Sequence, residues 1–280
     1  MHPFDISDDK WPAEFRNEIV AHINIIKHFT APTVSRENTP WHYVIDSEGD
    51  LYCSGNNLDS LQGCPSIING DFSCDSNRLT SLEFAPQYVS GAYSIDRNSI
   101  TSLEGIPKFI FKEFDCSLNA LSNLTGGPVW VSGNYNTGNN SLTSLVGAPD
   151  AVGNFYCANN RLSNFEGLPT KIVGQLNMSG NKITSLQGIH KHFKNGFIAG
   201  DIYIDVMHSH ILGLILIPGL TEVNLGLINV NVTNTHSSTI FCFQMFRAIE
   251  IINNHLEGDR DVIDCQQDLI NAGFKALAQL

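Results

Sequence analysis

A 21-residue pattern, repeated seven times in tandem, fills the middle of this chain and constrains its fold more than any other feature. Successive copies start 21 residues apart, except for a 20-residue step between the fifth and the sixth. Tandem repeats of this length are typical of solenoids, in which each repeat forms one coil that stacks on its neighbours. The copies start at Gly49, Gly70, Gly91, Lys112, Gly133, Gly153 and Gly174.

Two positions of each repeat predict a short strand with one buried face. The third position is always a large apolar or aromatic residue, the fifth is most often Cys, and polar residues or Tyr lie between them. This period of two indicates one strand per repeat, and stacked copies predict a parallel sheet. The two columns are Leu51, Phe72, Tyr93, Phe114, Tyr135, Phe155 and Leu176, and Cys53, Cys74, Ile95, Cys116, Thr137, Cys157 and Met178.

The eighth position is Asn in every copy, which indicates a structural role in the turn after the strand. An Asn amide supplies two donors and an acceptor, so stacked copies can satisfy backbone groups of their own turn and of the neighbouring one. A merely solvated turn residue would not need to be Asn in all seven copies. We therefore predict a ladder formed by Asn56, Asn77, Asn98, Asn119, Asn140, Asn160 and Asn181.

The repeated columns resemble those of the leucine-rich repeat family, and the resemblance covers residues 49–189. One copy carries it on Phe72, Cys74, Asn77, Leu79 and Leu82. The resemblance implies a curved solenoid with its strands on the concave side. Six return segments contain Pro, which disfavours helix interiors, so we expect extended or 3₁₀ return segments. In style the repeats are similar to leucine-rich-repeat proteins encoded by bacteriophages and bacteria.

The segments on either side of the repeats predict caps for the ends of the stack. Residues 1–48 contain a helical pattern over about 12–29, which we expect to lie against the first repeat, and then a short alternating stretch that predicts an incomplete strand. The helical pattern consists of Trp11, Phe15, Ile19, Ile23 and Ile26, and the alternating stretch of Trp41, Tyr43 and Ile45.

The repeat decays after Asn181, and residues 190–280 predict an α/β cap. Ile202–Ile204 and Ile211–Ile217 have the composition of buried strands, and helical patterns follow over about 238–256 and 260–278. A separate small domain with its own function is the alternative. The predicted fold is thus an α/β solenoid: a leucine-rich-repeat stack with a parallel sheet, an N-terminal helical cap and a C-terminal α/β cap.

Composition narrows the possible functions. The net charge is −12, and acids exceed bases in all three regions, so the chain lacks the basic stripe of a nucleic-acid-binding protein. An acidic mimic of DNA stays open as an alternative. The first residues lack an apolar signal region, and the longest strongly apolar stretch, Ile211–Ile217, is too short to span a bilayer. We therefore expect no membrane partner and a cytoplasmic location, which would be the host cytoplasm for a phage-encoded protein.

Candidate catalytic and metal-ligating residues are few. Four of the seven Cys lie in the buried fifth-position column, where thiols behave as small apolar residues. Cys265 is the alternative nucleophile, because bacterial leucine-rich-repeat ubiquitin ligases carry a catalytic Cys behind their repeats. Its place in an amphipathic helix favours a packed thiol instead. The pairs His190/His192 and His208/His210 would face one way on a strand, but no motif completes a metal site. We predict no enzymatic activity, no metal and no cofactor.

The outward strand positions form the predicted binding surface. Positions two, four and six are acidic in the first four repeats and rich in Asn and Tyr in the last three, which suits a protein or peptide with a basic face. The alternative is an ordinary solvated strand surface. The candidate partner-binding residues are Asp50, Tyr52, Asp71, Asp75, Asp96, Glu113, Asp115, Asn136 and Tyr156.

The predicted function is therefore a non-enzymatic protein-binding module, which in a phage-encoded protein would bind or modulate a host protein. Three alternatives are an enzyme with its catalytic group in the C-terminal region, a structural or virion-associated component, and the acidic DNA mimic.

Overall fold

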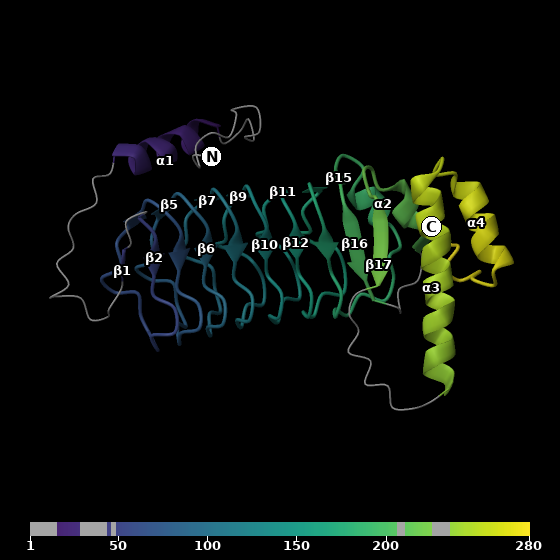
Figure 1. The fold of residues 1–280 in the computed structure, drawn as a ribbon, viewed down its shortest axis with the longest axis horizontal. Coiled ribbons are helices and arrows are strands. Elements are labelled where there is room, and N and C mark those ends of the chain that lie inside the picture. Colours follow the sequence, from purple (N-terminus) through teal and green to yellow (C-terminus); the bar gives the residue numbers. More distant parts are fainter. Residues whose placement is uncertain (1–15, 29–43, 46–48, 206–210, 226–235) are drawn as a thin grey trace.

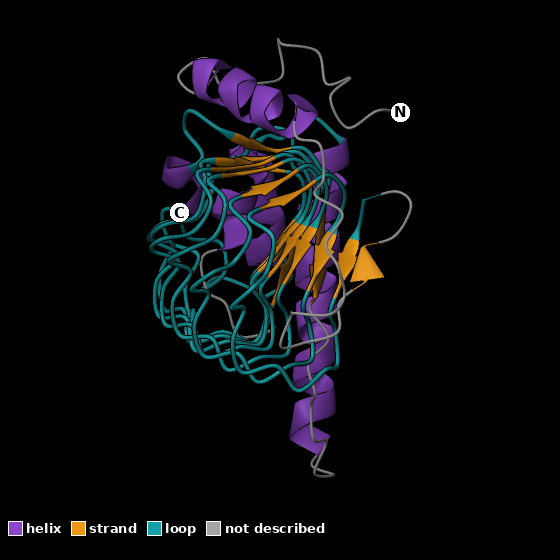
Figure 2. Ribbon diagram, turned by 90° about the vertical axis from the view of Figure 1, so that its left-hand side faces the viewer, coloured by secondary structure: helices purple, strands orange, loops and turns teal. Residues whose placement is uncertain are grey.

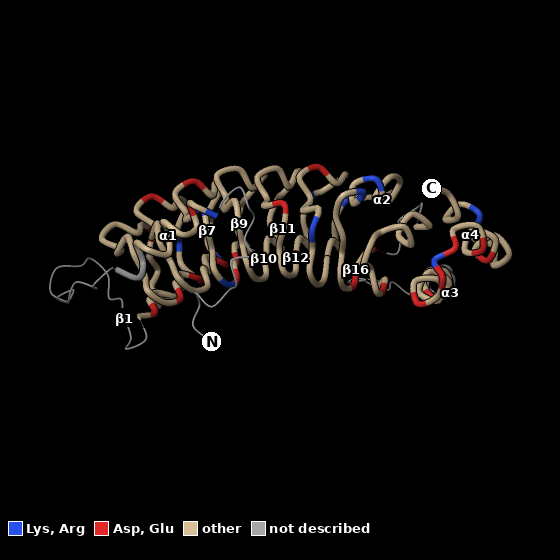
Figure 3. Tube along the Cα trace, turned by 90° about the horizontal axis from the view of Figure 1, so that it is seen from above, with Lys and Arg blue, Asp and Glu red and all other residues tan. Residues whose placement is uncertain are grey.

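The computed structural model describes residues 16–28, 44–45, 49–205, 211–225 and 236–280. The repeats form a parallel-sheet solenoid of about eight coils (Figure 1). Each coil contributes one strand to a ten-stranded sheet, and this sheet lies on the inner side of a gentle arch (Figure 3). In spatial order its strands are β1 (Val44–Ile45), β2 (Leu51–Tyr52), β4 (Phe72–Ser73), β6 (Tyr93–Ser94), β8 (Phe114–Asp115), β10 (Tyr135–Asn136), β12 (Phe155–Tyr156), β14 (Leu176–Asn177), β16 (Asp201–Ile204) and β17 (Glu222–Leu225).

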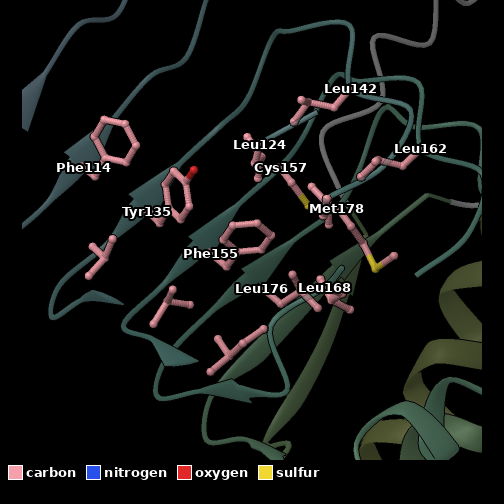
Figure 4. Close-up of a cluster of buried hydrophobic side chains, with 14 of the residues drawn as sticks. Phe114, Leu124, Tyr135, Leu142, Phe155, Cys157, Leu162, Leu168, Leu176 and Met178 are labelled. Carbon is pink, nitrogen blue, oxygen red and sulfur yellow. The ribbon is translucent and has the colours of Figure 1, made fainter. Parts of the chain in front are cut away.

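The strands pair in the register that the repeat predicts. Leu51 lies opposite Phe72 and Tyr135 opposite Phe155, so equivalent positions form continuous rows. Strand β1 is the exception, because it pairs with β2 in the antiparallel direction. The third-position side chains point into the core (Figure 4), where consecutive rings from Phe72 to Phe155 lie 4.9–5.9 Å apart. The two predicted core columns are confirmed, since every member is buried.

The return segments are extended, as predicted, and contribute a second ladder of two-residue strands. Figure 2, which looks along the stack, shows strands on two sides of each coil and loops on the others. Apolar side chains such as Val89, Ile110 and Ile172 point from this second ladder into the same core. Its strands are β3 (Ile67–Ile68), β5 (Tyr88–Val89), β7 (Phe109–Ile110), β9 (Trp130–Val131), β11 (Ala151–Val152), β13 (Lys171–Ile172) and β15 (Phe197–Ile198). They form three separate parallel sheets, in which β3 pairs with β5, β7 with β9, and β13 with both β11 and β15.

The predicted Asn ladder is confirmed for six of its seven members. Asn119 represents them: its Nδ2 donates to the carbonyl oxygens of Ile95 (3.0 Å) and Cys116 (3.2 Å). Its Oδ1 accepts from the backbone nitrogen of Ile100 (3.0 Å). Each such Asn therefore bonds to backbone groups of its own coil and of the coil before it. Asn56 differs because it belongs to the first repeat, and it is exposed.

Helix α1 (Arg16–His28) forms within the predicted range but not in the predicted place. Its buried residues Ile19 and Ile23 pack against aromatic side chains of the second ladder, Phe109 and Trp130 among them. It therefore lies along the side of the stack rather than against the first repeat (Figure 1). The aromatic side chains that project outward from β5, β7 and β9 explain this position. Trp11, Phe15, Trp41 and Tyr43 lie outside the described residues.

The C-terminal region continues the sheet and then turns helical. Strands β16 and β17 extend the ten-stranded sheet, and α2 (Ile189–His192) precedes them. The predicted strand over Ile211–Ile217 is wrong, because Ile211–Leu216 is a 3₁₀ helix. All five residues from 211 to 215 are buried, and a strand, whose side chains alternate between two faces, would need both of its faces covered.

Two longer helices complete the chain. Helix α3 (His236–Glu257) contacts β17, and α4 (Val262–Asn271) packs against α3. Helix α4 ends seven residues before the predicted limit of 278, and Gly273, with a positive φ of 91°, follows its end. Among the described helices, none has the length and apolar character needed to cross a membrane.

Candidate functional site

All nine candidate residues lie on the face of the ten-stranded sheet that points away from the core, or at the edge of the sheet. We call this face the outer face. Tyr52 and Glu113 are exposed, and the other seven are partly exposed. Because the strands are in register, the fourth positions form one continuous row across the sheet, which we call the fourth-position row. It runs through Tyr52, Ser73, Ser94, Asp115, Asn136, Tyr156 and Asn177 and ends at Tyr203 and Asn224.

Three neighbouring coils bring Asp75, Asp96 and Asp115 together: Asp115 belongs to the fourth-position row, and Asp75 and Asp96 lie beside it. Ser73 Oγ donates to Asp75 Oδ1 (2.6 Å), and Ser94 Oγ donates to Asp96 Oδ1 (2.9 Å). These bonds hold the carboxylates in fixed orientations. We call Asp75, Asp96 and Asp115 the acidic row.

The protonation of Asp96 depends on the two other carboxylates of the acidic row. Burial raises the pKa of Asp96, and the negative charges of Asp115 and Asp75 raise it further, against the opposing effects of Ser94 and Arg97. Burial also raises the pKa of Asp75, but hydrogen bonds from neighbouring hydroxyl groups, that of Ser73 among them, outweigh it, and its net shift is downward. A cation bound between these groups would relieve the repulsion at Asp96.

Two of the second-position acids, Asp50 and Asp71, have a structural role that the sequence analysis missed. Asp50 Oδ1 accepts from the backbone nitrogen of Asp71 (2.6 Å), and Asp71 Oδ1 accepts from that of Ala92 (2.9 Å). Asn154 Oδ1 accepts in the same way from Gln175 (2.6 Å). The signal was present in the sequence, since this column holds Asp or Asn in four of its seven copies.

Asp71 is also engaged by a cation of the same chain. Lys112 Nζ lies 2.9 Å from Asp71 Oδ1, and this hydrogen bond raises the pKa of Lys112. Arg97 similarly pairs with Asp96 (3.2 Å), but its side chain is 63% exposed and can turn away. Asp50 and Asp71 are therefore weaker candidates for partner contact than the acidic row.

Tyrosines flank the acidic row on both sides. Tyr52 lies on the N-terminal side, where its hydroxyl donates to Asp50 Oδ2 (3.0 Å). Tyr156 lies on the C-terminal side, and burial together with nearby Tyr203 raises its pKa. Tyr203 was missed because it follows the last recognisable repeat, yet register places it in the fourth-position row. Tyrosine offers a partner both apolar area and a hydrogen bond.

The fully buried cysteines among the described residues lie in environments that disfavour nucleophilic chemistry. Cys265 is fully buried, and burial together with the charge of Asp268 raises its pKa to about 12, so the thiol is protonated at neutral pH. Cys53, Cys74, Cys116 and Cys157 are also fully buried, as the predicted register requires. The side chain of Cys242 is outside the described residues.

The predicted geometry of the histidine pairs is wrong for the one that is described. His190 and His192 lie in helix α2 rather than on a strand, and residues two apart on a helix do not face the same way. His192 Nε2 lies 2.9 Å from the carbonyl oxygen of Leu168. His208 and His210 are outside the described residues. In the described part of the chain, no three His, Cys, Asp or Glu side chains converge as a metal site would require.

Comparison with known proteins adds no assignment. No protein-family model matches this chain, and no curated protein matches its sequence. Function is therefore inferred from the geometry of the sheet face.

Proposed function

We propose that this protein is a non-enzymatic binding module and that the outer face of its ten-stranded sheet binds a protein or peptide with a basic surface. The observation that carries the proposal is the acidic row, held in place by Ser and Asn side chains and flanked by Tyr52 and Tyr156. Helix α1 lies over the second ladder and α3 lies beside β17, so the described helices leave β2 to β14 uncovered (Figures 1 and 2).

The charges favour a cationic partner. Lys or Arg side chains of the partner would offset the mutual repulsion within the acidic row and stabilise the ionised form of Asp96. Because the pKa of Asp96 is raised in the free protein, binding should weaken as the pH falls through the range in which Asp96 gains its proton. Added salt should weaken binding too, since the carboxylates are partly exposed.

We also propose a repeat family and a cellular location for this protein. The Asn column and the Φ-x-C-x-x-N-x-L pattern favour a leucine-rich-repeat protein, with the C-terminal region as the cap of its stack. The location that we propose is the cytoplasm. The similarity in style to phage and bacterial repeat proteins adds a role for a phage-encoded chain: it would bind a host protein and inhibit or redirect it.

Charge neutralisation tests the proposal. The variant Asp75→Asn, Asp96→Asn and Asp115→Asn removes three charges but keeps side chains that can accept the Ser hydrogen bonds. The matched control is Glu83→Gln, Glu104→Gln and Glu166→Gln, which removes three exposed charges from the return segments. Each tagged protein is incubated with lysate of the native host, and bound proteins are quantified by mass spectrometry.

The proposal requires a protein that the wild type and the Glu variant both enrich and that the Asp variant loses. Tyr52→Ala and Tyr156→Ala should then speed its dissociation, because they remove buried contact area. If the Asp variant captures the same proteins as the wild type, with an unchanged circular dichroism spectrum, the sheet face is not the binding surface.

A further inference from the structure

Helix α4 is the outermost element at the C-terminal end of the protein (Figure 1). Its inner side, with buried Cys265 and Leu269, packs against α3 and the 3₁₀ helix that precedes β17. Ile263, Gln267 and Ile270 are exposed. Because they are spaced four and three residues apart, they lie on one face of the helix. We call these three residues the α4 stripe.

The α4 stripe is more apolar than an outward helix face needs to be. Ile263 is 74% exposed, the highest fraction among the large apolar side chains of the described chain, and Ile270 is 40% exposed. Single exposed apolar side chains are common on protein surfaces, but two within two turns of a ten-residue helix form a patch. Such patches mark interaction sites, so the α4 stripe indicates a surface that another molecule covers.

The charges at the two ends of α4 favour a second copy of the same helix as that molecule. Asp259, Asp261 and Asp264 are exposed at the start of the helix, and exposed Lys275 follows its end. Two copies side by side in the same direction would bring the acids together. In the antiparallel direction, Lys275 of each copy lies near the acids of the other, and the helix dipoles attract. A two-fold axis generates this antiparallel arrangement.

The middle of the α4 stripe is self-complementary. Antiparallel pairing about its midpoint places Ile263 of one copy against Ile270 of the other, with Gln267 of both copies near the two-fold axis. A Gln amide carries both donors and an acceptor, so two of these amides can bond to each other. Within one chain, Gln267 Nε2 donates to Asn271 Oδ1 (2.8 Å), which leaves the Gln267 Oε1 atom to accept from the second copy.

We propose that this protein forms a two-fold symmetric dimer through antiparallel pairing of its α4 helices, with Ile263 and Ile270 at the centre of the interface. The α4 stripe is short, so the interface lies at the lower end of the size range for specific complexes, and the dimer should exchange with the monomer. Because α4 lies beyond α3 at the end of the stack, both ten-stranded sheets stay uncovered in the dimer (Figure 1). The dimer is therefore independent of what the sheet binds.

Sedimentation-velocity centrifugation of the full-length chain tests this dimer at concentrations from about 1 to about 300 μM. One variant combines Ile263→Glu with Ile270→Glu, which places charges on the α4 stripe at exposed positions. The matched control combines Val146→Glu with Val173→Glu, a comparable change at two exposed apolar positions of the repeats. Circular dichroism and melting temperature show whether each variant is folded.

The wild type and the Val variant should dimerise with the same dissociation constant. The Ile variant should raise that constant at least about a hundredfold, because both copies lose their central apolar contacts. Lys275→Glu should raise it about tenfold, since each Lys275 contact becomes repulsive. Adding Asp259→Lys to Lys275→Glu should restore dimerisation, because opposite charges again meet between the two copies.

Four results would overturn the proposal. The first two are a wild type that stays monomeric over the whole range and a dimer that persists in the Ile variant. The third is a Lys275→Glu variant that dimerises as well as the wild type, which would refute the antiparallel direction. The fourth is a series of species larger than a dimer that grows with concentration, which would indicate a head-to-tail contact in place of a closed pair.

Discussion

The repeats and the C-terminal region achieve order in different ways. In the repeats, one set of contacts recurs in coil after coil: each Asn from Asn77 to Asn181 bonds to equivalent backbone groups. In the C-terminal region, polar contacts without equivalents elsewhere join distant segments. Asn253 pairs with both backbone groups of Val223, and the Arg260 guanidinium donates to the carbonyl oxygens of Ile217 and Leu220.

The difference shows how a repeat satisfies its backbone groups. Because each stacked coil has an equivalent coil on either side, the same set of hydrogen bonds can form throughout the stack. The same stacking makes each coil intolerant of added atoms, since its neighbours approach closely on both sides. The helical end of the C-terminal region is not stacked in this way, and its single contacts have no equivalents elsewhere in the described chain.

Removal of the C-terminal region should have the largest effect on the protein, because it tests whether the repeats are stable alone. Removal of residues 190–280 would expose the apolar interior of the last repeat, including Leu176, Met178 and Leu186, which are buried in the full chain. We expect the shortened protein to aggregate, as measured by size-exclusion chromatography with light scattering. A monomer with an unchanged melting temperature would instead identify residues 190–280 as an independent domain.

Two glycines with similar backbones separate the effect of stacking from that of conformation. Gly147 (φ 98°) lies in the repeats, where an added Cβ would be 2.3 Å from the Leu124 carbonyl group. Gly273 (φ 91°) follows α4 and has open space around it. Gly147→Ala should cost about 3 kcal/mol or more of unfolding free energy, and Gly273→Ala about 1–2 kcal/mol. If urea denaturation gave similar losses of unfolding free energy for the two variants, the neighbouring coil would be moving aside for the added methyl group.

Loss of a ladder amide should have the next largest effect. Asn119→Ala leaves the buried backbone nitrogen of Ile100 without its acceptor and removes one of the two amide donors to each of the carbonyl oxygens of Ile95 and Cys116. It should lower stability by roughly 1–3 kcal/mol. Asn253→Ala should cost about 1 kcal/mol, because water can replace its amide at the edge of the sheet. Ser99→Ala, an exposed substitution in the repeats, serves as the control. A loss at Asn119 no greater than at Ser99 would contradict the ladder's contribution to stability.

The smallest expected change in stability is that caused by placing Asn at a left-handed position, and its sign should differ between the repeats and the C-terminal region. Leu118 (φ 54°) and Arg260 (φ 58°) both adopt the left-handed conformation, which Asn tolerates better than either. Leu118→Asn should raise stability by up to about 1 kcal/mol, because it relieves strain at an exposed site. Arg260→Asn should lower stability, because two carbonyl groups lose the guanidinium. Thermal denaturation of both variants tests the contrast, which a stabilised Arg260→Asn would contradict.

The features that repeat in the sequence were predictable, and those without a repeated chemical type were not. The core columns and the Asn ladder each keep one kind of side chain, so period and hydrogen-bonding capacity identified them. The seventh position is left-handed in all seven repeats, yet it holds residues as different as Gly55, Arg97 and Leu118. These residues share a backbone conformation but no type of side chain, so an alignment of the repeats does not reveal what they have in common.

Other misses arose where tertiary contacts decide the structure. The apolar run at 211–217 fits a buried strand or a buried helix equally well by composition. The position of α1 depended on the aromatic side chains of the second ladder, which sequence reasoning assigned to no surface. In the candidate site, periodicity placed all nine residues on one face. It did not separate Asp50 and Asp71, which bond to backbone groups, from the acidic row.

The Asn ladder has a direction, and this has a consequence for how the protein is made. Each Asn donates to, and accepts from, backbone groups of the coil that precedes it, as Asn98 does with Cys74 and Leu79. A coil emerging from the ribosome therefore keeps unsatisfied groups until the next coil has been translated. Coils should therefore add to the stack one at a time from the N-terminus, and each coil should be completed only after the next one has been synthesised. The last repeat has no eighth-position Asn after it. Its seventh-position nitrogen, that of Gly180, donates to the Asp205 carboxylate, whereas that of Asn159 in the preceding repeat donates to the carbonyl oxygen of Ser179, so the last coil is completed only when the C-terminal region has been translated.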